Sequence, residues 1–258
     1  MHDLTVFKKN ESYIRLECDY GISQELSDYF SFYIPGYQFT PKFKNKMWDG
    51  KIRLYNSRTN LIYYGLISYI KLFCEERDYS VAIDPKIELQ EEFSLIEAQN
   101  FIETLKLPHI VRDYQLSAFV NAIRNKRIVI LSPTGSGKSL VLYLIIRYLQ
   151  RTEKKGLLVV PTISLVSQMY KDFQDYGYDS EKYCHRIQAG IEKDSEKFLY
   201  ISTWQSIFTQ PAKYFHKFDF IMGDEAHTFK ATSLTHIVES CVNAKYRIGT
   251  TGTLPNNG

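Results

Sequence analysis

The sequence predicts an α/β fold in two parts: a mainly parallel sheet covered by helices in the second part of the chain, and a small α+β domain before it. From residue 128 onward, short unbroken apolar runs alternate with helix-like stretches, which is typical of a parallel sheet with both faces covered. Before residue 93, strand-like and helix-like runs follow one another without this alternation. The chain has 258 residues, 44% of them hydrophobic, so it is long enough to build two domains.

Residues 1–92 form the predicted α+β accessory domain, with turn signals such as Pro35-Gly36 between its elements. Residues 93–110 form a predicted helical linker region, because apolar residues recur at helical spacing from Ser94 to Leu107 and Pro108 then ends the element. Residues 111–258 make up the predicted second domain. In the accessory domain we expect strands over 4–7, 13–18, 52–55 and 61–64, and helices over 24–32 and 66–76.

The second domain contains five apolar runs that read as buried strands. Ligands of a parallel sheet bind beyond the carboxyl ends of its strands, so the polar residues that follow each run are the first candidates for a functional site. We expect the strands over 128–131, 157–160, 198–202, 218–222 and 246–250, and helices that include 140–149 and 164–176 between them.

A glycine-rich segment, Ser132-Pro-Thr-Gly-Ser-Gly-Lys-Ser139, follows the first of these strands and precedes a helix. This is the arrangement of a phosphate-binding loop, although the pattern GxxxxGK[ST] has its first glycine replaced by Ser132. Glycines permit positive φ and close approach of the backbone to phosphate, the lysine neutralises phosphate oxygens, and the final hydroxyl can ligate Mg²⁺. The residues predicted to hold a Mg-nucleotide here are Thr134, Gly135, Ser136, Gly137, Lys138 and Ser139.

An acidic pair, Asp224 and Glu225, follows the apolar run 218–222 at a second strand end. Such a pair is often only a helix cap, but the phosphate loop upstream favours a catalytic role. We expect Asp224 to hold the metal, through water, and Glu225 to orient and deprotonate an attacking water.

A window of the first domain is locally basic, although the net charge of the chain is only +3. Basic side chains interleaved with an aromatic one can meet phosphates and stack on bases, whereas a charged, solvated hairpin is the alternative. The residues predicted to contact nucleic acid in this window are Lys42, Lys44, Lys46, Trp48, Lys51 and Arg53.

The four cysteines are scattered without a CxxC pair, which indicates reduced thiols rather than a metal site or a disulfide framework. The sequence shows neither a secretory leader nor an apolar run of the ~20 residues that span a bilayer. We therefore expect a cytoplasmic protein with no membrane partner.

Taken together, several segments resemble the first motor domain of superfamily 2 helicases, a RecA-like P-loop NTPase domain, over about residues 110–255. They are Arg112-Asp-Tyr-Gln115, the phosphate loop, Val160-Pro161-Thr162, Thr203-Trp204-Gln205, Asp224-Glu-Ala-His227 and Thr250-Thr-Gly-Thr253. The resemblance implies ATP and Mg²⁺ as cofactors, adenine recognition by Arg112 and Gln115, and catalysis by Lys138, Asp224, Glu225 and His227. It also implies nucleic-acid contacts by Pro161, Thr162, Thr203, Trp204 and Gln205, and coupling of nucleotide state to domain closure by Thr251 and Thr253.

The run from Lys46 to Tyr55 ahead of such a motor resembles phage recombination and repair helicases of this superfamily. That resemblance implies an ATP-dependent DNA helicase or translocase, expected to be monomeric, that acts on branched or duplex DNA in recombination, repair and stalled-fork processing in the host cytoplasm. It further implies a second RecA-like domain of the same polypeptide that supplies an arginine to the nucleotide. We expect the 258-residue chain alone to bind ATP weakly, hydrolyse it slowly and not unwind DNA. A DEAH-type RNA helicase and an ATP-gated clamp on branched DNA are the alternatives.

Overall fold

The computed structural model describes residues 2–88, 90–133, 135–188, 190–225 and 231–252. The chain divides into two compact units that meet in the sequence at residues 88 and 89. This division lies four residues before the predicted boundary at 92, and it leaves no separate linker: helix α4 (Leu95–Leu105) belongs to the second unit. The reason is that Ala98 and Phe101 of α4 are buried in the core of that unit, where the Phe101 ring lies 5.9 Å from the ring of Phe119.

The first unit is built on a five-stranded sheet in the order β5-β6-β2-β1-β7. Neighbouring strands are antiparallel except for β1 and β7, which run parallel. Alternate residues of β1 and β2, such as Val6 and Leu16, are buried against helices α1 and α3, as the period of a strand with one covered face requires. The bounds are β1 Leu4–Lys8, β2 Tyr13–Cys18, α1 Tyr20–Tyr29, β5 Tyr55–Asn56, β6 Leu61–Tyr63, the 3₁₀ helix η2 Tyr64–Leu66, α3 Ile67–Glu75 and β7 Val81–Ile83.

Residues 31–53 form a separate extension of the first unit, here called the arm. Its two strands pair antiparallel with each other and not with the five-stranded sheet. The predicted helix over 24–32 is therefore wrong at its end: α1 starts at Tyr20, capped by the Asp19 carboxylate that accepts from Ile22 N at 2.8 Å, and a strand begins at Ser31. The arm consists of β3 Ser31–Tyr33, the 3₁₀ helix η1 Tyr37–Phe39, α2 Pro41–Lys44 and β4 Lys51–Arg53.

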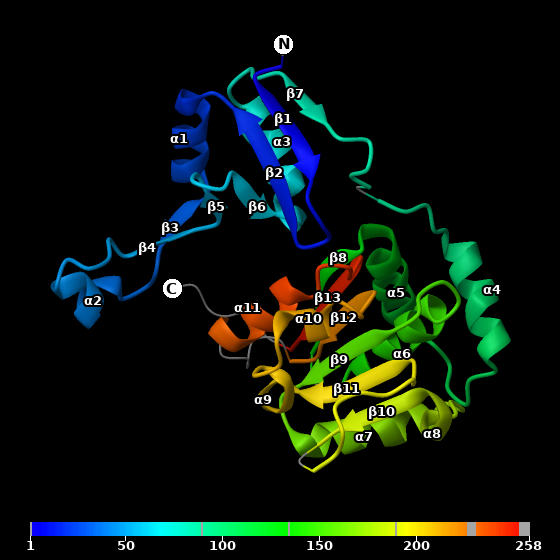
Figure 1. Ribbon diagram of the computed structural model, residues 1–258. Helices are drawn as coiled ribbons and strands as arrows, with labels where there is room; N and C mark the ends of the chain where they lie inside the picture. The colour runs from blue at the N-terminus through cyan, green and yellow to red at the C-terminus, as the bar shows by residue number, and fades with distance from the viewer. Residues whose placement is uncertain (1, 89, 134, 189, 226–230, 253–258) are drawn as a thin grey trace. The chain divides into compact units, whose positions relative to one another are not determined.

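The second unit contains a six-stranded sheet in the order β10-β11-β9-β12-β13-β8, and all of its strand pairs are parallel (Figure 1). The predicted fold class is thus confirmed. The strands are β8 Arg127–Leu131, β9 Gly156–Val160, β10 Cys184–Ile187, β11 Leu199–Thr203, β12 Phe220–Gly223 and β13 Tyr246–Thr251. The other helices are α5 Asp113–Asn125, α6 Lys138–Leu149, α7 Ile163–Asp175, α8 Ser180–Tyr183, α9 Trp204–Ile207, α10 Ala212–Phe215 and α11 Ala231–Ser240.

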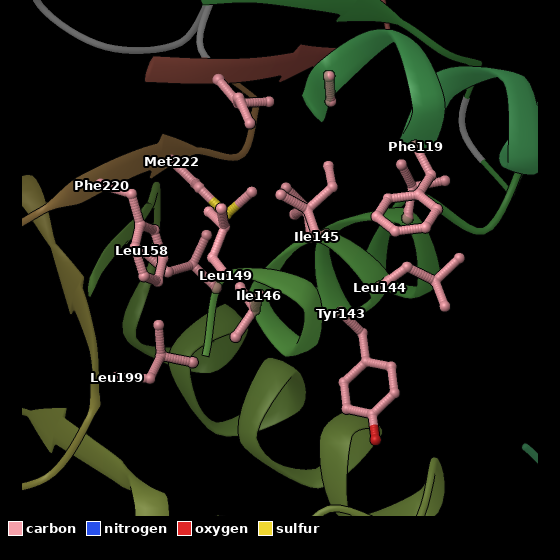
Figure 2. Close-up of a cluster of buried hydrophobic side chains, with 14 of the residues drawn as sticks. Phe119, Tyr143, Leu144, Ile145, Ile146, Leu149, Leu158, Leu199, Phe220 and Met222 are labelled. Carbon is pink, nitrogen blue, oxygen red and sulfur yellow. The ribbon is translucent and has the colours of Figure 1, made fainter. Parts of the chain in front are cut away.

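Each face of this sheet has its own core. Even-numbered residues of the central strands, such as Leu158 and Met222, pack against α5, α6 and α7, and Figure 2 shows the α6 side chains Ile145 and Ile146 beside them. Odd-numbered residues such as Leu157 pack on the opposite face with α9, α10 and α11. Because the strands are covered on both faces, they read in the sequence as unbroken apolar runs.

Within the described residues, none of the helices is both long enough and apolar enough to cross a membrane. The four cysteines are free thiols. Burial raises the pKa of the Cys184 and Cys241 thiols to about 12, which keeps them protonated and unreactive at neutral pH.

Candidate functional site

The glycine-rich segment forms a loop between β8 and α6. Gly135 and Gly137 have φ values of +79° and +77°, a region that favours glycine, and Gly137 is the N-cap of α6. A Cβ atom at Gly135 would meet no heavy atom within 4 Å, so the backbone there is open to a ligand. Ser132, which replaces the usual glycine, is buried, and its hydroxyl forms a hydrogen bond with that of Ser136. The serine at this position therefore stabilises the loop and does not project into the space open to a ligand.

Lys138, the first residue of α6, forms an ion pair with Glu225, which lies 87 residues further along the chain. Glu225 follows β12, and its other carboxylate oxygen accepts from Gly252 N at 3.3 Å, just after β13. The Glu225 backbone has φ +49°, which is uncommon for a residue other than glycine and occurs often at functional sites. The predicted catalytic lysine and glutamate therefore lie in direct contact.

Asp224 is the buried acid of this site, with 4% of its surface exposed. Burial raises its pKa above the usual value, while a hydrogen bond that Thr250 Oγ1 donates to Asp224 Oδ1 at 2.6 Å opposes the rise. The backbone N–H of Asp224 donates to Val159 O at 2.9 Å, which fixes the turn after β12 to the neighbouring strand β9. The carboxylate is thus held in one place.

Thr250 is a site residue that the sequence prediction missed. We predicted Thr251 and Thr253 as the hydroxyls that communicate with the nucleotide, but Thr250 bonds the acid; the Thr251 carbonyl accepts from Ser132 N at 2.9 Å. The register of the sheet explains this choice: Gly223 pairs with Gly249, so the next residues, Asp224 and Thr250, come side by side. The parity of buried residues along β12 and β13 could have identified it.

A pocket of about 560 Å³ opens beside the phosphate loop. Gln115 lies in its wall, and its side-chain amide bridges two segments: Oε1 accepts from Arg112 N at 3.0 Å and Nε2 donates to Ser136 O at 3.1 Å. The predicted adenine-recognition residues therefore reach the phosphate loop. The lining residues are Pro108, His109, Ile110, Arg112, Gln115, Gly135, Ser136, Gly137, Leu140 and Tyr176.

Tyr176 is a second residue that sequence reasoning missed. It follows the end of α7, lines the pocket, and its hydroxyl lies 2.9 Å from Ser139 Oγ, the predicted metal ligand. Asp172, one turn earlier on α7, also interacts with Ser139, whose hydrogen bond lowers the pKa of the carboxyl while burial, the larger effect, raises it. Nothing in the sequence near Tyr176 signals this contact, because it depends on how α7 packs against α6.

The residues of the phosphate loop and of the acidic strand end are of the types that bind a nucleotide together with Mg²⁺. The loop offers open backbone at positive-φ glycines and a lysine, and the hydroxyl of Ser139 and the carboxylate of Asp224 are the oxygen ligands that Mg²⁺ prefers. Among the described residues no group of three or more His, Cys, Asp or Glu side chains could hold a metal by itself.

Four of the five residues predicted to contact nucleic acid in the second unit line one pocket of about 660 Å³. They lie at or just after the carboxyl ends of the neighbouring strands β9 and β11, at the same edge of the sheet as the phosphate loop. Trp204 is the exception: it is half-buried against the core of the odd-numbered face, 5.8 Å from the Phe208 ring. The pocket is lined by Pro161, Thr162, Ile163, Gln188, Gly190, Ile191, Lys193, Thr203, Gln205 and Ser206.

The basic residues predicted in the first unit all lie on the arm. Lys42, Lys44 and Lys46 are exposed, on or next to α2. Trp48 is half-buried and its indole N–H donates to Lys51 O at 2.9 Å, so it serves the structure of the arm. Three further predicted residues, Thr134, His227 and Thr253, lie outside the described residues.

A parallel sheet with a phosphate loop after one strand and a paired acid after another defines a RecA-like P-loop domain. Comparison with known proteins identifies the family. Residues 3–84 match the family described as "DNA helicase UvsW, N-terminal", and residues 108–256 match "Type III restriction enzyme, res subunit". The ATP-dependent DNA helicase uvsW of Enterobacteria phage T4 is 34% identical over an alignment of 265 positions that covers 98% of this chain and 52% of that protein.

Solved structures agree with the sequence matches. The crystal structure of the UvsW helicase from Bacteriophage T4 superimposes with a TM-score of 0.90 at 32% identity, over 98% of this chain and 93% of that one. A second relative found by sequence, the DNA 3'-5' translocase XPB2 of Sulfurisphaera tokodaii, is 31% identical over 161 residues, covering 60% of this chain and 34% of that protein. The chain belongs to the UvsW helicase family, and it spans about half the length of the curated phage relative.

Proposed function

We propose that this chain is the nucleotide-binding and DNA-contacting part of an ATP-dependent DNA helicase or translocase that acts on branched DNA in recombination, repair and stalled-fork processing. The observation that carries the proposal is the contact between Lys138 and Glu225, because it brings the phosphate loop and the acidic strand end to one place. The match to the UvsW family along nearly the whole chain supports the same reading.

In this proposal each residue has a defined part. Lys138 would bind phosphate oxygens of ATP in place of Glu225, and the Glu225 carboxylate would then be available to orient and deprotonate the attacking water. Ser139 and Asp224 would hold Mg²⁺, which neutralises phosphate charge when bound with the nucleotide. Gln115, Arg112 and Tyr176 form the pocket that would receive the adenine.

The DNA contacts would come from two places. The pocket that contains Thr162 and Thr203 offers hydroxyls and backbone groups at strand ends, which suit phosphate and sugar contacts. The lysines of the arm add positive charge on a separate unit. Contacts of this kind carry little sequence information, so we expect substrate choice to depend on DNA structure.

Fast hydrolysis would need a second RecA-like domain, which supplies an arginine worth about 10³–10⁵ in rate in related phosphoryl-transfer sites. We therefore propose that the 258-residue chain on its own binds Mg-ATP weakly, turns it over slowly and does not unwind DNA.

The test is nucleotide binding and steady-state ATPase of the chain and of its Glu225→Gln variant, with branched DNA and with RNA of the same geometry. Glu225→Gln should retain ATP, because amide and carboxylate have the same shape, and lose the residual turnover. Binding should favour DNA. Turnover unaffected by Glu225→Gln would support a clamp that uses ATP only as a ligand, and preferential binding of RNA would support an RNA helicase; either result would contradict the proposal.

A further inference from the structure

The arm has a defined shape of its own. The rings of Tyr33 and Tyr37 stack at 4.7 Å, and Phe43 packs edge-on against Tyr37 at 4.8 Å. Gly50 lies so close to this cluster that a Cβ atom there would come within 2.1 Å of the Tyr37 ring. The aromatic residues at the centre of the arm therefore pack against one another and stabilise its fold. This packing fixes the positions of the exposed side chains of the arm.

Several large apolar side chains of the arm are exposed, and two of them are more exposed than the others. Phe39, just before α2, and Met47, just after it, are each 77% exposed. Burying such side chains is favourable, by roughly 25 cal/mol for each Å² of apolar surface, so two of them held in solvent on a small arm indicate a surface that meets a partner.

The charge around these side chains identifies the partner. Residues 31–53 contain five cationic residues and one acidic residue, Asp49, which pairs with Arg53; this pairing lowers the pKa of Asp49 to about 2. Within the described part of the chain, Lys42, Lys44 and Lys46 have no acidic partner. A partner that offers both dense negative charge and flat apolar faces is a nucleic acid with unstacked bases.

We propose that Phe39 and Met47 contact the faces of bases that are unstacked at a DNA branch point, while Lys42 and Lys44 hold the flanking phosphates. This rests on the proposed function, because it requires that the arm meets DNA at all. In a continuous duplex the base faces are covered by stacking, and only phosphates and groove edges are available; at a branch, base faces become accessible. The arm would thus distinguish a junction from linear duplex without reading sequence.

The experiment compares affinity for a three-way junction and for linear duplex of equal length, using the full 258-residue chain, with 2-aminopurine placed at the branch. Phe39→Ala should lower affinity for the junction about tenfold, leave affinity for linear duplex nearly unchanged and abolish the 2-aminopurine response. Met47→Ala should act in the same direction. Tyr20→Ala is the matched control, since Tyr20 is 80% exposed on α1, outside the arm, and should change nothing. Equal melting temperatures of the variants confirm that each one folds.

Charge variants separate this inference from the proposed function. Lys42→Glu with Lys44→Glu should weaken binding to both DNAs and reduce the salt dependence. If the charge variants weaken binding but Phe39→Ala leaves the preference for the junction intact, the base-contact inference is overturned and the DNA role of the arm stands. If the charge variants change nothing, the DNA role of the arm itself fails. If Phe39→Ala alters the oligomeric state in sedimentation, the surface joins copies of the chain and the inference is again wrong.

Discussion

Among single residues, Asp224 is the clearest case of a proposed functional side chain that lowers the stability of the fold at neutral pH. Its carboxylate is buried, and burial opposes its charge, so its pKa lies above the ordinary value of 3.8 in spite of the Thr250 hydrogen bond. The folded protein therefore holds this proton more tightly than the unfolded chain does. As the pH rises from about 4 through the raised pKa, the folded state loses stability, and above that pH the loss is complete.

We therefore predict that Asp224→Asn stabilises the ligand-free protein at neutral pH, on the order of 1 kcal/mol, while it abolishes Mg²⁺-dependent nucleotide binding. An asparagine oxygen can still accept from Thr250, so the substitution removes the charge and keeps the hydrogen bond. Denaturant unfolding at a series of pH values measures this. The stability advantage of the variant should grow through the window above pH 4 and then stay constant; an advantage that shrinks over that window would contradict the assigned direction.

Tyr176 contributes a contact that can be removed without changing the pocket wall. If Ser139 holds Mg²⁺ as proposed, its hydroxyl proton would need an acceptor, and the neighbouring groups are the Tyr176 hydroxyl and the Asp172 carboxyl. Burial raises the pKa of Tyr176, so its hydroxyl stays neutral. Groups that orient a metal ligand in this way typically affect metal affinity by a factor of ten or more.

Tyr176→Phe should therefore raise the Mg²⁺ concentration needed for half-maximal ATP binding about tenfold. ATP binding without Mg²⁺ should be unchanged, because the ring still lines the pocket. Tyr170→Phe is the control, since Tyr170 also lies on α7 but does not line this pocket. Equal losses with and without Mg²⁺ would mean that Tyr176 supports only the shape of the site.

At the scale of elements, the parallel sheet depends on close packing between neighbouring strands. Gly156 begins β9, and a Cβ atom there would come within 1.8 Å of the Phe220 ring on the neighbouring strand β12. The register pairs these two residues, so neither strand can move aside without changing the position of the catalytic turn after β12. Such overpacking typically costs about 1–3 kcal/mol.

Gly156→Ala is predicted to lower the free energy of unfolding of the second unit by about 1–3 kcal/mol. Combining it with Phe220→Leu should cost less than the sum of the two single variants, because the smaller side chain makes room for the methyl group. Thermal unfolding followed by circular dichroism measures all three. Strict additivity would show that the two residues do not compete for the same space.

Most elements that position the site could be predicted from the sequence, because the strands of a sheet covered on both faces are unbroken apolar runs. The short strands β3, β7 and β10 could not, since they lie at sheet edges or in the two-stranded sheet of the arm, where fewer residues are buried. The arm was predicted as charged but not as a folded extension, because its aromatic cluster depends on contacts between Tyr37 and residues on both sides of it. Helix α4 was predicted as a helix but assigned to a linker, because its apolar spacing does not reveal that this face packs on α5.

In the candidate site too, local sequence features could be predicted, whereas contacts that depend on packing could not. Lys138, Ser139, Asp224 and Glu225 could be assigned from residue type and spacing at strand ends. Thr250 was missed by one position because the choice between neighbouring threonines depends on sheet register. Tyr176 was missed because it reaches the site from the end of a helix.

For the whole molecule, the decisive feature is that the residues of the second unit proposed to bind nucleotide and those proposed to contact nucleic acid share one edge of one sheet. β8 and β12 end at the phosphate loop and the acidic pair, while β9 and β11 end at the pocket with Thr162 and Thr203. Since all these strands are parallel, a change at one end of the row can reach the other through the same rigid sheet. This arrangement supports the proposed function, in which contact with DNA would depend on the nucleotide state.

The central claim is that the loop at Lys138 and the acid at Asp224 hold one metal-bound triphosphate together. The most direct measurement is a double-mutant cycle on Mg-ATP affinity by calorimetry, with Lys138→Ala, Asp224→Asn and the two combined. We predict that each single variant loses at least about tenfold in affinity, that only Lys138→Ala weakens ATP binding without Mg²⁺, and that the double variant loses less than the product of the two. Independent, multiplying losses, or Mg-ATP affinity unchanged by either variant, would contradict the account.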